Sequence, residues 1–116
     1  MNNIIPRQYD YAGVYMIENI TNKKVYIGSS RDIENRLRTH RRALRNGTHH
    51  CKAMQEDFNL HHKFVARILY VEAAPRRTSF NRNRLYAMEY KFIEQYDAFN
   101  TGYNQLGMSD IVKNAI

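Results

Sequence analysis

Cysteine, proline, tryptophan and long apolar runs are scarce in this chain. Its 116 residues include a single cysteine, which excludes an internal disulfide framework and favours a reducing compartment. Two prolines and five glycines exclude a collagen-like or low-complexity chain. No stretch approaches the roughly 20 apolar residues of a transmembrane helix, and the first residues lack the basic and apolar regions of a signal peptide. We therefore expect a cytoplasmic, intracellular protein with no membrane partner.

Positive charge is what the chain has in excess. Lysine and arginine number 18 against 11 aspartates and glutamates, which gives a net charge of +7 and a pI near 9.7. With 43% hydrophobic residues the composition is that of a globular protein, and the length predicts one domain over 1–116. A basic surface favours polyanions, because neutralising phosphates releases counterions. A basic protein without a nucleic-acid role is the alternative.

Hydrophobic periodicity predicts an α/β fold: a small three-stranded antiparallel sheet flanked by helices. We expect strands over 11–18, 24–28 and 64–72, and helices from 31 or 32 to 46, over 51–59 and from 79 or 81 to 96. The third strand is nearly continuous in apolar residues, which predicts a partly central position. A serine after Gly28 is expected to cap the first long helix, and Gly47 to end it. A helical turn or two is expected after Ser109.

The first long helix separates into a basic face and a buried face when its residues are plotted at about 100° each. Arg36 falls at the edge of the buried face, and His40 falls within it. Polar side chains there need partners or a purpose. The basic face is predicted to contact the phosphates of a nucleic acid, with an ordinary solvated face as the alternative. Its members are Arg31, Arg38, Arg41, Arg42 and Arg45.

Glu89 is the most informative residue of the last long helix. Its helical position lies inside the apolar stripe, whereas Glu94 points to solvent. A buried carboxylate is unfavourable unless it is paired, hydrogen-bonded or bound to a metal. It could therefore form an ion pair with one of the arginines, or it could hold a hard cation such as Mg²⁺, which often takes only one or two protein carboxylates.

Two short glycine–tyrosine motifs lie in the predicted hairpin, Gly13-Val14-Tyr15 and Tyr26-Ile27-Gly28, with a ten-residue gap between them. This pattern closely resembles the signature of the GIY-YIG nuclease family, with valine in place of the usual isoleucine. The resemblance extends over about 12–104, and 105–116 form a tail. Further positions that match the family in order are Arg36, His40, His49, Glu89 and Asn104, and the histidine at 49 is typical of the phage homing-endonuclease branch.

The resemblance implies hydrolysis of phosphodiester bonds in DNA with one divalent cation, Mg²⁺ with Mn²⁺ as a substitute, held by Glu89. Tyr15 would deprotonate or orient the water, and Tyr26, His40 or nearby cations would lower its pKa or relay its proton. Arg36 would stabilise the developing negative charge. Asn104 would orient a phosphate, a water or the glutamate. His49 and Gly28 are further candidates for contact with the reacting groups or a phosphate.

The expected partner is double-stranded DNA, without a small-molecule cofactor, and the chain is most similar to the catalytic domain of phage-type homing endonucleases. Larger homing enzymes carry a linker and a separate DNA-binding region, so recognition of a long site is not expected. A catalytically inactive or accessory nucleic-acid-binding module of the same fold is the main alternative, and an RNA-directed nuclease is a third. Structural zinc is not expected, because His49, His50 and Cys51 are adjacent rather than suitably spaced.

Overall fold

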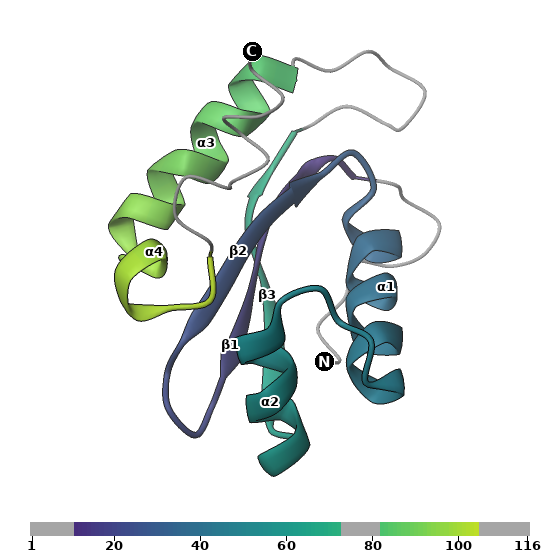
Figure 1. Cartoon of the computed structure of the whole chain (residues 1–116). Coiled ribbons are helices and arrows are strands. Elements are labelled where there is room, and N and C mark those ends of the chain that lie inside the picture. Colours follow the sequence, from purple (N-terminus) through teal and green to yellow (C-terminus); the bar gives the residue numbers. More distant parts are fainter. Residues whose placement is uncertain (1–10, 73–81, 105–116) are drawn as a thin grey trace.

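The computed structural model describes residues 11–72 and 82–104, and it has the predicted α/β architecture (Figure 1). In chain order the elements are β1 (Gly13–Asn19), β2 (Val25–Ser30), α1 (Ile33–Asn46), α2 (Lys52–Leu60), β3 (Phe64–Val71), α3 (Arg82–Gln95) and α4 (Ala98–Thr101). The short helix α4 was not predicted. The helical turn expected after Ser109 lies outside the described residues. None of the described helices has the length and apolar character that crossing a membrane requires.

The three strands form one antiparallel sheet in the order β2-β1-β3. The expectation that the third strand would be partly central is wrong, because β1 is central and β3 is an edge strand. Its apolar run has another cause. Helices cover both faces of the sheet, so even the edge strand packs on two sides, with Phe64 and Ala66 in one core and Leu69 and Tyr70 against the other.

The two faces of the sheet carry separate cores, as the alternation in β1 predicts. Tyr15 and Ile17 pack with α1 and α2, whereas Val14 and Met16 pack with α3 and α4. In Figure 1 the sheet accordingly lies between α3 and α4 on one side and α1 and α2 on the other. Side chains that are adjacent in a strand therefore project into different cores.

Helix α1 is bounded by two capping residues. The Asp32 side chain accepts a hydrogen bond from the Asn35 backbone N–H at 3.1 Å, so aspartate, not the expected serine, caps the helix. The Ser30 hydroxyl bonds the backbone of Asp32 instead. At the other end Gly47 has φ +74°, and its N–H returns to the last turn as predicted.

The outer edge of β2 is covered by the segment that follows α4. The Tyr103 N–H donates to the Val25 carbonyl at 2.8 Å. The Asn104 side chain then pairs with both peptide groups of Ile27, accepting from its N–H at 2.9 Å and donating to its carbonyl at 2.8 Å. This cover ends at Ile27, one residue before Gly28.

Candidate active site

A cleft of about 100 Å³ opens where the cover of β2 ends. Because successive side chains of a strand point to opposite faces, Gly28 belongs to the α1 side of the sheet and Ser29 to the α3 side. The cleft therefore joins side chains from both faces around the edge of β2. It is lined by Tyr15, Tyr26, Gly28, Ser29, Arg36, Tyr86 and Glu89.

Tyr15 and Gly28 are paired across the β1–β2 ladder. A Cβ atom at Gly28 would lie 2.5 Å from the Tyr15 hydroxyl oxygen and 2.6 Å from the ring carbon that carries it. Only glycine therefore leaves room for the tyrosine ring, which is 2% exposed. Tyr15 of the first motif therefore requires the glycine at position 28 that ends the second motif.

Behind the Tyr15 hydroxyl lie two buried imidazole rings. The Tyr15 oxygen is 2.7 Å from His40 Nε2, and His40 Nδ1 is 2.7 Å from His49 Nε2. Burial is the main cause that lowers the pKa of His40 to about 3, and the neighbouring His49 lowers it further. Burial and the nearby His50 lower the pKa of His49 to about 4. Both rings are therefore neutral at pH 7.

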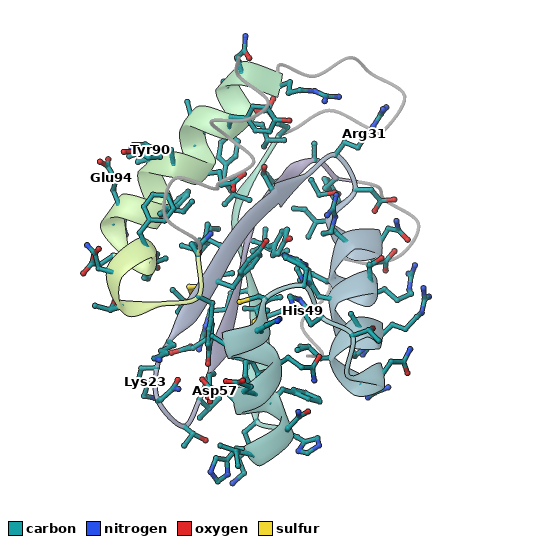
Figure 2. The ribbon with its side chains drawn as sticks, in the orientation of Figure 1. Lys23, Arg31, His49, Asp57, Tyr90 and Glu94 are labelled. Carbon is teal, nitrogen blue, oxygen red and sulfur yellow. The ribbon has the colours of Figure 1, made fainter. Side chains whose placement is uncertain are left out.

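Tyr26 covers this group from the cleft side. Its ring is half-buried, with its centroid 6.5 Å from that of Tyr15 and 5.2 Å from that of His40. Neither His40 nor His49 lines the cleft itself. Of the four aromatic candidates, the two tyrosines thus face the cleft and the two histidines support them. Figure 2 shows His49 in the connection between α1 and α2.

Glu89 reaches the cleft from α3 and is 7% exposed, as its helical position predicted. The Ser29 hydroxyl donates a hydrogen bond to one of its oxygens. Glu94 is exposed and projects from the outer side of the same helix (Figure 2).

The donor set around Glu89 fits a hard cation. Within residues 11–72 and 82–104, no three His, Cys, Asp or Glu side chains form a metal cluster. The described side chains of this cleft therefore do not surround a metal ion on all sides, unlike the four protein ligands of a structural zinc site. One carboxylate beside an open cleft fits Mg²⁺, which usually keeps several waters and binds through one or two carboxylates plus substrate phosphates.

Arg36 is exposed and not at the edge of the core. It lines the first cleft and also a second one of about 190 Å³, which shares Ser29 and Tyr86 with the first. Two further arginines, Arg31 and Arg82, line this second cleft. Among the described residues neither Arg36 nor Arg82 has an ion-pair partner. The second cleft therefore gathers three guanidinium groups next to the first.

Three further residues line the clefts and were not among the predicted site residues: Ser29, Arg82 and Tyr86. A signal for two of them was present, because Arg82, Tyr86 and Glu89 follow the spacing of one helical face. Arg82 and Tyr86 lie seven and three positions before Glu89, so they share its helical face. This spacing could have identified both as neighbours of the candidate glutamate. Ser29 could not have been found in this way, because its contact with Glu89 spans 60 residues.

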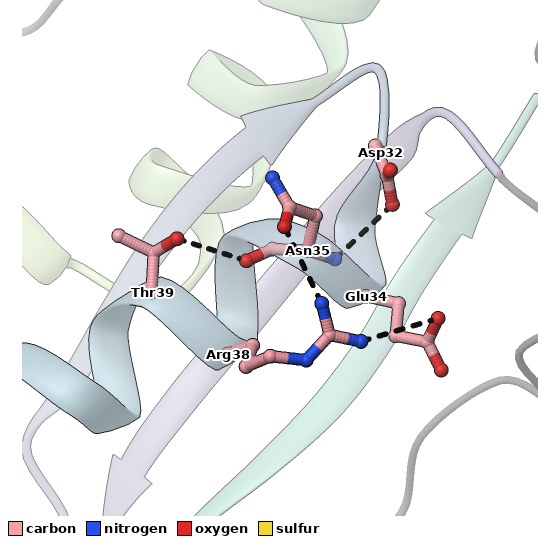
Figure 3. A network of polar contacts seen from close by, with 5 residues as sticks. All are labelled: Asp32, Glu34, Asn35, Arg38 and Thr39. Carbon is pink, nitrogen blue, oxygen red and sulfur yellow. Dashed lines mark hydrogen bonds and ion pairs between the residues drawn. The ribbon is translucent and has the colours of Figure 1, made fainter.

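The basic stripe expected on α1 is not continuous. Arg31 precedes the helix and lines the second cleft. Arg38 pairs with Glu34 at 3.6 Å and contacts the Asn35 side chain at 3.4 Å, within a local network that also contains Asp32 and Thr39 (Figure 3). Arg41 is half-buried. The arginines of α1 that project freely outward, Arg42 and Arg45, are both exposed.

Asn104 has a different place from the one expected. The resemblance implies that it orients a phosphate, a water or Glu89. Instead both ends of its amide bond the backbone of Ile27, between Tyr26 and Gly28, and Asn104 does not line the cleft. Asn104 is buried, and these two hydrogen bonds hold the strand β2, which carries the cleft residues Tyr26, Gly28 and Ser29.

Comparisons with known proteins point to one family. The family described as the GIY-YIG catalytic domain matches residues 11–104. Intron-associated endonuclease 1 of Enterobacteria phage T4 is 33% identical over 94 residues, which cover 80% of this chain and 36% of that protein. This chain thus spans about a third of the length of its phage relative.

Two solved structures are similar to this fold. One is the catalytic domain of the homing endonuclease I-TevI, with a TM-score of 0.70 and 32% identity, covering 81% of this chain and 97% of that one. The other is a mutant of the catalytic domain of intron endonuclease I-TevI, with a TM-score of 0.69 and 29% identity, covering 81% and 92% of the two chains.

Proposed function

This chain belongs to the GIY-YIG family of endonuclease catalytic domains, and we propose that it is a divalent-metal-dependent endonuclease that hydrolyses phosphodiester bonds in double-stranded DNA. The observation that carries this proposal is one cleft lined by three chemically distinct side chains. Tyr15 comes from β1, Arg36 from α1 and Glu89 from α3. A module that only binds nucleic acid has no need of a buried carboxylate at this place.

Glu89 is the proposed metal ligand. Mg²⁺ is the proposed ion and Mn²⁺ its substitute, because carboxylate oxygen is a ligand that suits both. A bound divalent cation supplies positive charge at the scissile phosphate and the leaving oxygen. The hydroxyl of Ser29 holds one carboxylate oxygen of Glu89 in place, which supports a fixed orientation of the ligand.

Tyr15 is the proposed group that orients the attacking water and takes its proton. A tyrosine with an ordinary pKa of about 10 is a weak catalyst at neutral pH, so its phenolate form needs stabilisation. The Arg36 guanidinium in the same cleft and the imidazole of His40 behind the hydroxyl can provide it. Arg36 would also donate hydrogen bonds to the phosphate oxygens, for which its planar fork is suited.

Supporting residues complete the proposal. Tyr26 closes the cleft side of the Tyr15–His40 pair, and Gly28 leaves space for the Tyr15 hydroxyl. Asn104 is proposed as a positioning residue that fixes the backbone between Tyr26 and Gly28. It acts on the reaction only through the place of these two residues.

The DNA backbone is proposed to continue from the first cleft into the second. Arg31, Arg36 and Arg82 line this second cleft, and a nucleic-acid backbone has a phosphate for each guanidinium. Arg42 and Arg45 extend the basic surface along α1, whereas Arg38 and Arg41 are secondary candidates, because one is paired and the other half-buried. The similarity to the catalytic domain of the homing endonuclease I-TevI supports a place in a homing-type enzyme.

Plasmid cleavage tests the proposed function. Purified protein is incubated with supercoiled plasmid, with Mg²⁺ in one series and with EDTA in the other, and with a structured RNA in parallel. We expect nicked or linear DNA only in the Mg²⁺ series. DNA binding without cleavage under every divalent metal would instead favour the inactive binding module, and cleavage of RNA alone would favour the RNA-directed nuclease.

A further inference from the structure

A chain of three buried hydrogen bonds runs from the start of α2 to the cleft. The Cys51 backbone N–H contacts His49 Nδ1 at 3.0 Å. His49 Nε2 contacts His40 Nδ1, and His40 Nε2 contacts the Tyr15 hydroxyl, each at 2.7 Å. All four residues are at most 6% exposed. Solvent therefore has little access to these bonds, and each proton position must be settled within the chain itself.

The direction of the chain follows from its first member. A backbone N–H only donates, so Nδ1 of His49 must present its lone pair to Cys51. The neutral ring of His49 then carries its proton on Nε2, which faces His40 Nδ1. His40 must accept there, and its own proton is on Nε2, which faces Tyr15. The low pKa of both rings keeps each with a single proton at pH 7.

We propose that the Cys51 backbone amide, acting through His49, sets the direction of the hydrogen bond between His40 and Tyr15, so that His40 donates and the Tyr15 oxygen accepts. The proton of the Tyr15 hydroxyl then points away from His40. His40 supports the phenolate form of Tyr15 as a donor, and it is not the base that receives the tyrosine proton. That proton leaves to water on the cleft side.

The opposite direction is blocked by the amide. In that direction a neutral His40 would accept a hydrogen bond from the Tyr15 hydroxyl at Nε2, so its proton would be on Nδ1. His49 would then accept at Nε2 and carry its own proton on Nδ1. The N–H of His49 Nδ1 would then face the N–H of Cys51, and two donors cannot share a hydrogen bond. The three-bond chain is consistent in one direction only.

The Gln55 side chain holds the backbone of His49 in place. Its side-chain oxygen accepts the His49 backbone N–H at 3.0 Å. Its side-chain nitrogen donates to the Leu44 carbonyl at 3.0 Å and to the Asn59 side chain at 2.9 Å. Gln55 is buried, and it joins the His49 backbone to the end of α1. His49 and Gln55 are therefore positioning residues, which act on Tyr15 through His40.

Two variants of Cys51 separate its amide from its side chain. Both Cys51→Pro and Cys51→Ala remove the thiol and its contact with the Tyr103 carbonyl. Only Cys51→Pro also removes the backbone N–H donor. The φ of Cys51 is −87°, close to the about −65° of proline, and proline is tolerated at the start of a helix. A difference between the two variants therefore reports on the amide.

Nitrogen-15 NMR of the histidine rings reads the proton positions directly, in the protein without DNA. In the unaltered chain we expect His40 and His49 both neutral at pH 7, with a proton on Nε2 and a bare Nδ1. The exposed His50 stacks on His49 at 4.6 Å, so His50→Gln helps to assign the signals. A His40 ring with its proton on Nδ1 would overturn the proposal, whether or not Cys51→Pro folds.

Cleavage kinetics give the second readout. The catalytic meaning of the hydrogen-bond direction rests on the proposed function, in which Tyr15 acts on the water. We expect Cys51→Pro to cleave about tenfold to a hundredfold more slowly than Cys51→Ala, as is typical when a supporting hydrogen-bond partner is lost. Equal rates, with the His49 proton displaced in the proline variant, would contradict the proposal. If the protein has the expected ring protons but never cleaves DNA, the proposed function is refuted and the proposed hydrogen-bond direction is not.

Discussion

Gly28→Ala is expected to slow DNA cleavage by on the order of 100-fold because it displaces the Tyr15 hydroxyl, in addition to lowering the stability of the fold. The added Cβ would lie 2.5 Å from the Tyr15 hydroxyl oxygen, whereas ordinary van der Waals contact begins at 3.4 Å. Reaching 3.4 Å from 2.5 Å requires a displacement of about 0.9 Å of the oxygen or the strand. A misplacement of about 1 Å in an active site can cost on the order of 100-fold in rate. Overpacking of a well-packed core costs about 1–3 kcal/mol.

Gly47→Ala is the matched control for this variant. No atom lies within 4 Å of a Cβ added at Gly47, but the φ of +74° strains any residue with a side chain. The expected loss of stability is roughly 1 kcal/mol, at the lower end of the range for Gly28→Ala, without a change at Tyr15. Urea denaturation and single-turnover cleavage are measured for both variants. Cleavage by Gly28→Ala at the rate of Gly47→Ala would contradict the proposal that the position of the Tyr15 hydroxyl beside Gly28 matters for cleavage.

Three further predictions concern the tyrosine, the surface arginines and the histidines. Tyr15→Phe should lower the single-turnover rate by about 10²–10⁴-fold, the range for loss of an acid–base group, with at most ~1 kcal/mol lost in urea denaturation; a fully active variant contradicts the assignment. Replacing both Arg42 and Arg45 by glutamine should reduce the salt dependence of duplex binding by about 0.9 in the log–log slope for each lost phosphate contact, and an unchanged slope would mean that neither contacts DNA. Because the pKa values of His40 and His49 are lowered to about 3 and about 4, the unfolded chain binds protons first as the pH falls below about 6.5. Their contribution to stability is therefore complete above that pH and should fall by on the order of 2 kcal/mol between pH 6 and pH 5. A variant with both rings replaced by glutamine should lose that part of the pH dependence in urea denaturation, and an identical pH dependence would contradict the low pKa values.

Much of the fold could be predicted because each strand and helix has its own periodicity. The alternation of side chains in a strand accounts for the places of Tyr15 and Val14 on different faces, and the helical spacing around Glu89 correctly predicted its burial. The place of β3 at the sheet edge could not be predicted in this way. Its apolar residues report that both faces are covered, and that is equally true of a central strand.

The site could be predicted less completely, because it forms where the sheet ends. A helical plot gives the direction of Arg36 relative to its own helix, but not that its side chain is exposed beside a cleft that β2 and α3 also line. Nor does it show that Asn104 bonds the backbone of Ile27, 77 residues away. The contact of Cys51 with His49 is made by a backbone amide, which no residue type signals.

Metal-dependent cleavage by Glu89→Gln tests the central claim most directly. Glutamine keeps the shape of the side chain and removes the negative charge that would bind a hard cation. Single-turnover cleavage of plasmid DNA is measured over a Mg²⁺ titration for this variant and for the unaltered chain, with DNA affinity measured in parallel. We expect cleavage to be lost at every Mg²⁺ concentration that saturates the unaltered chain, while DNA affinity stays within a few-fold. Cleavage by Glu89→Gln at a near-normal rate and at low Mg²⁺ would contradict the proposal that this carboxylate holds the catalytic metal.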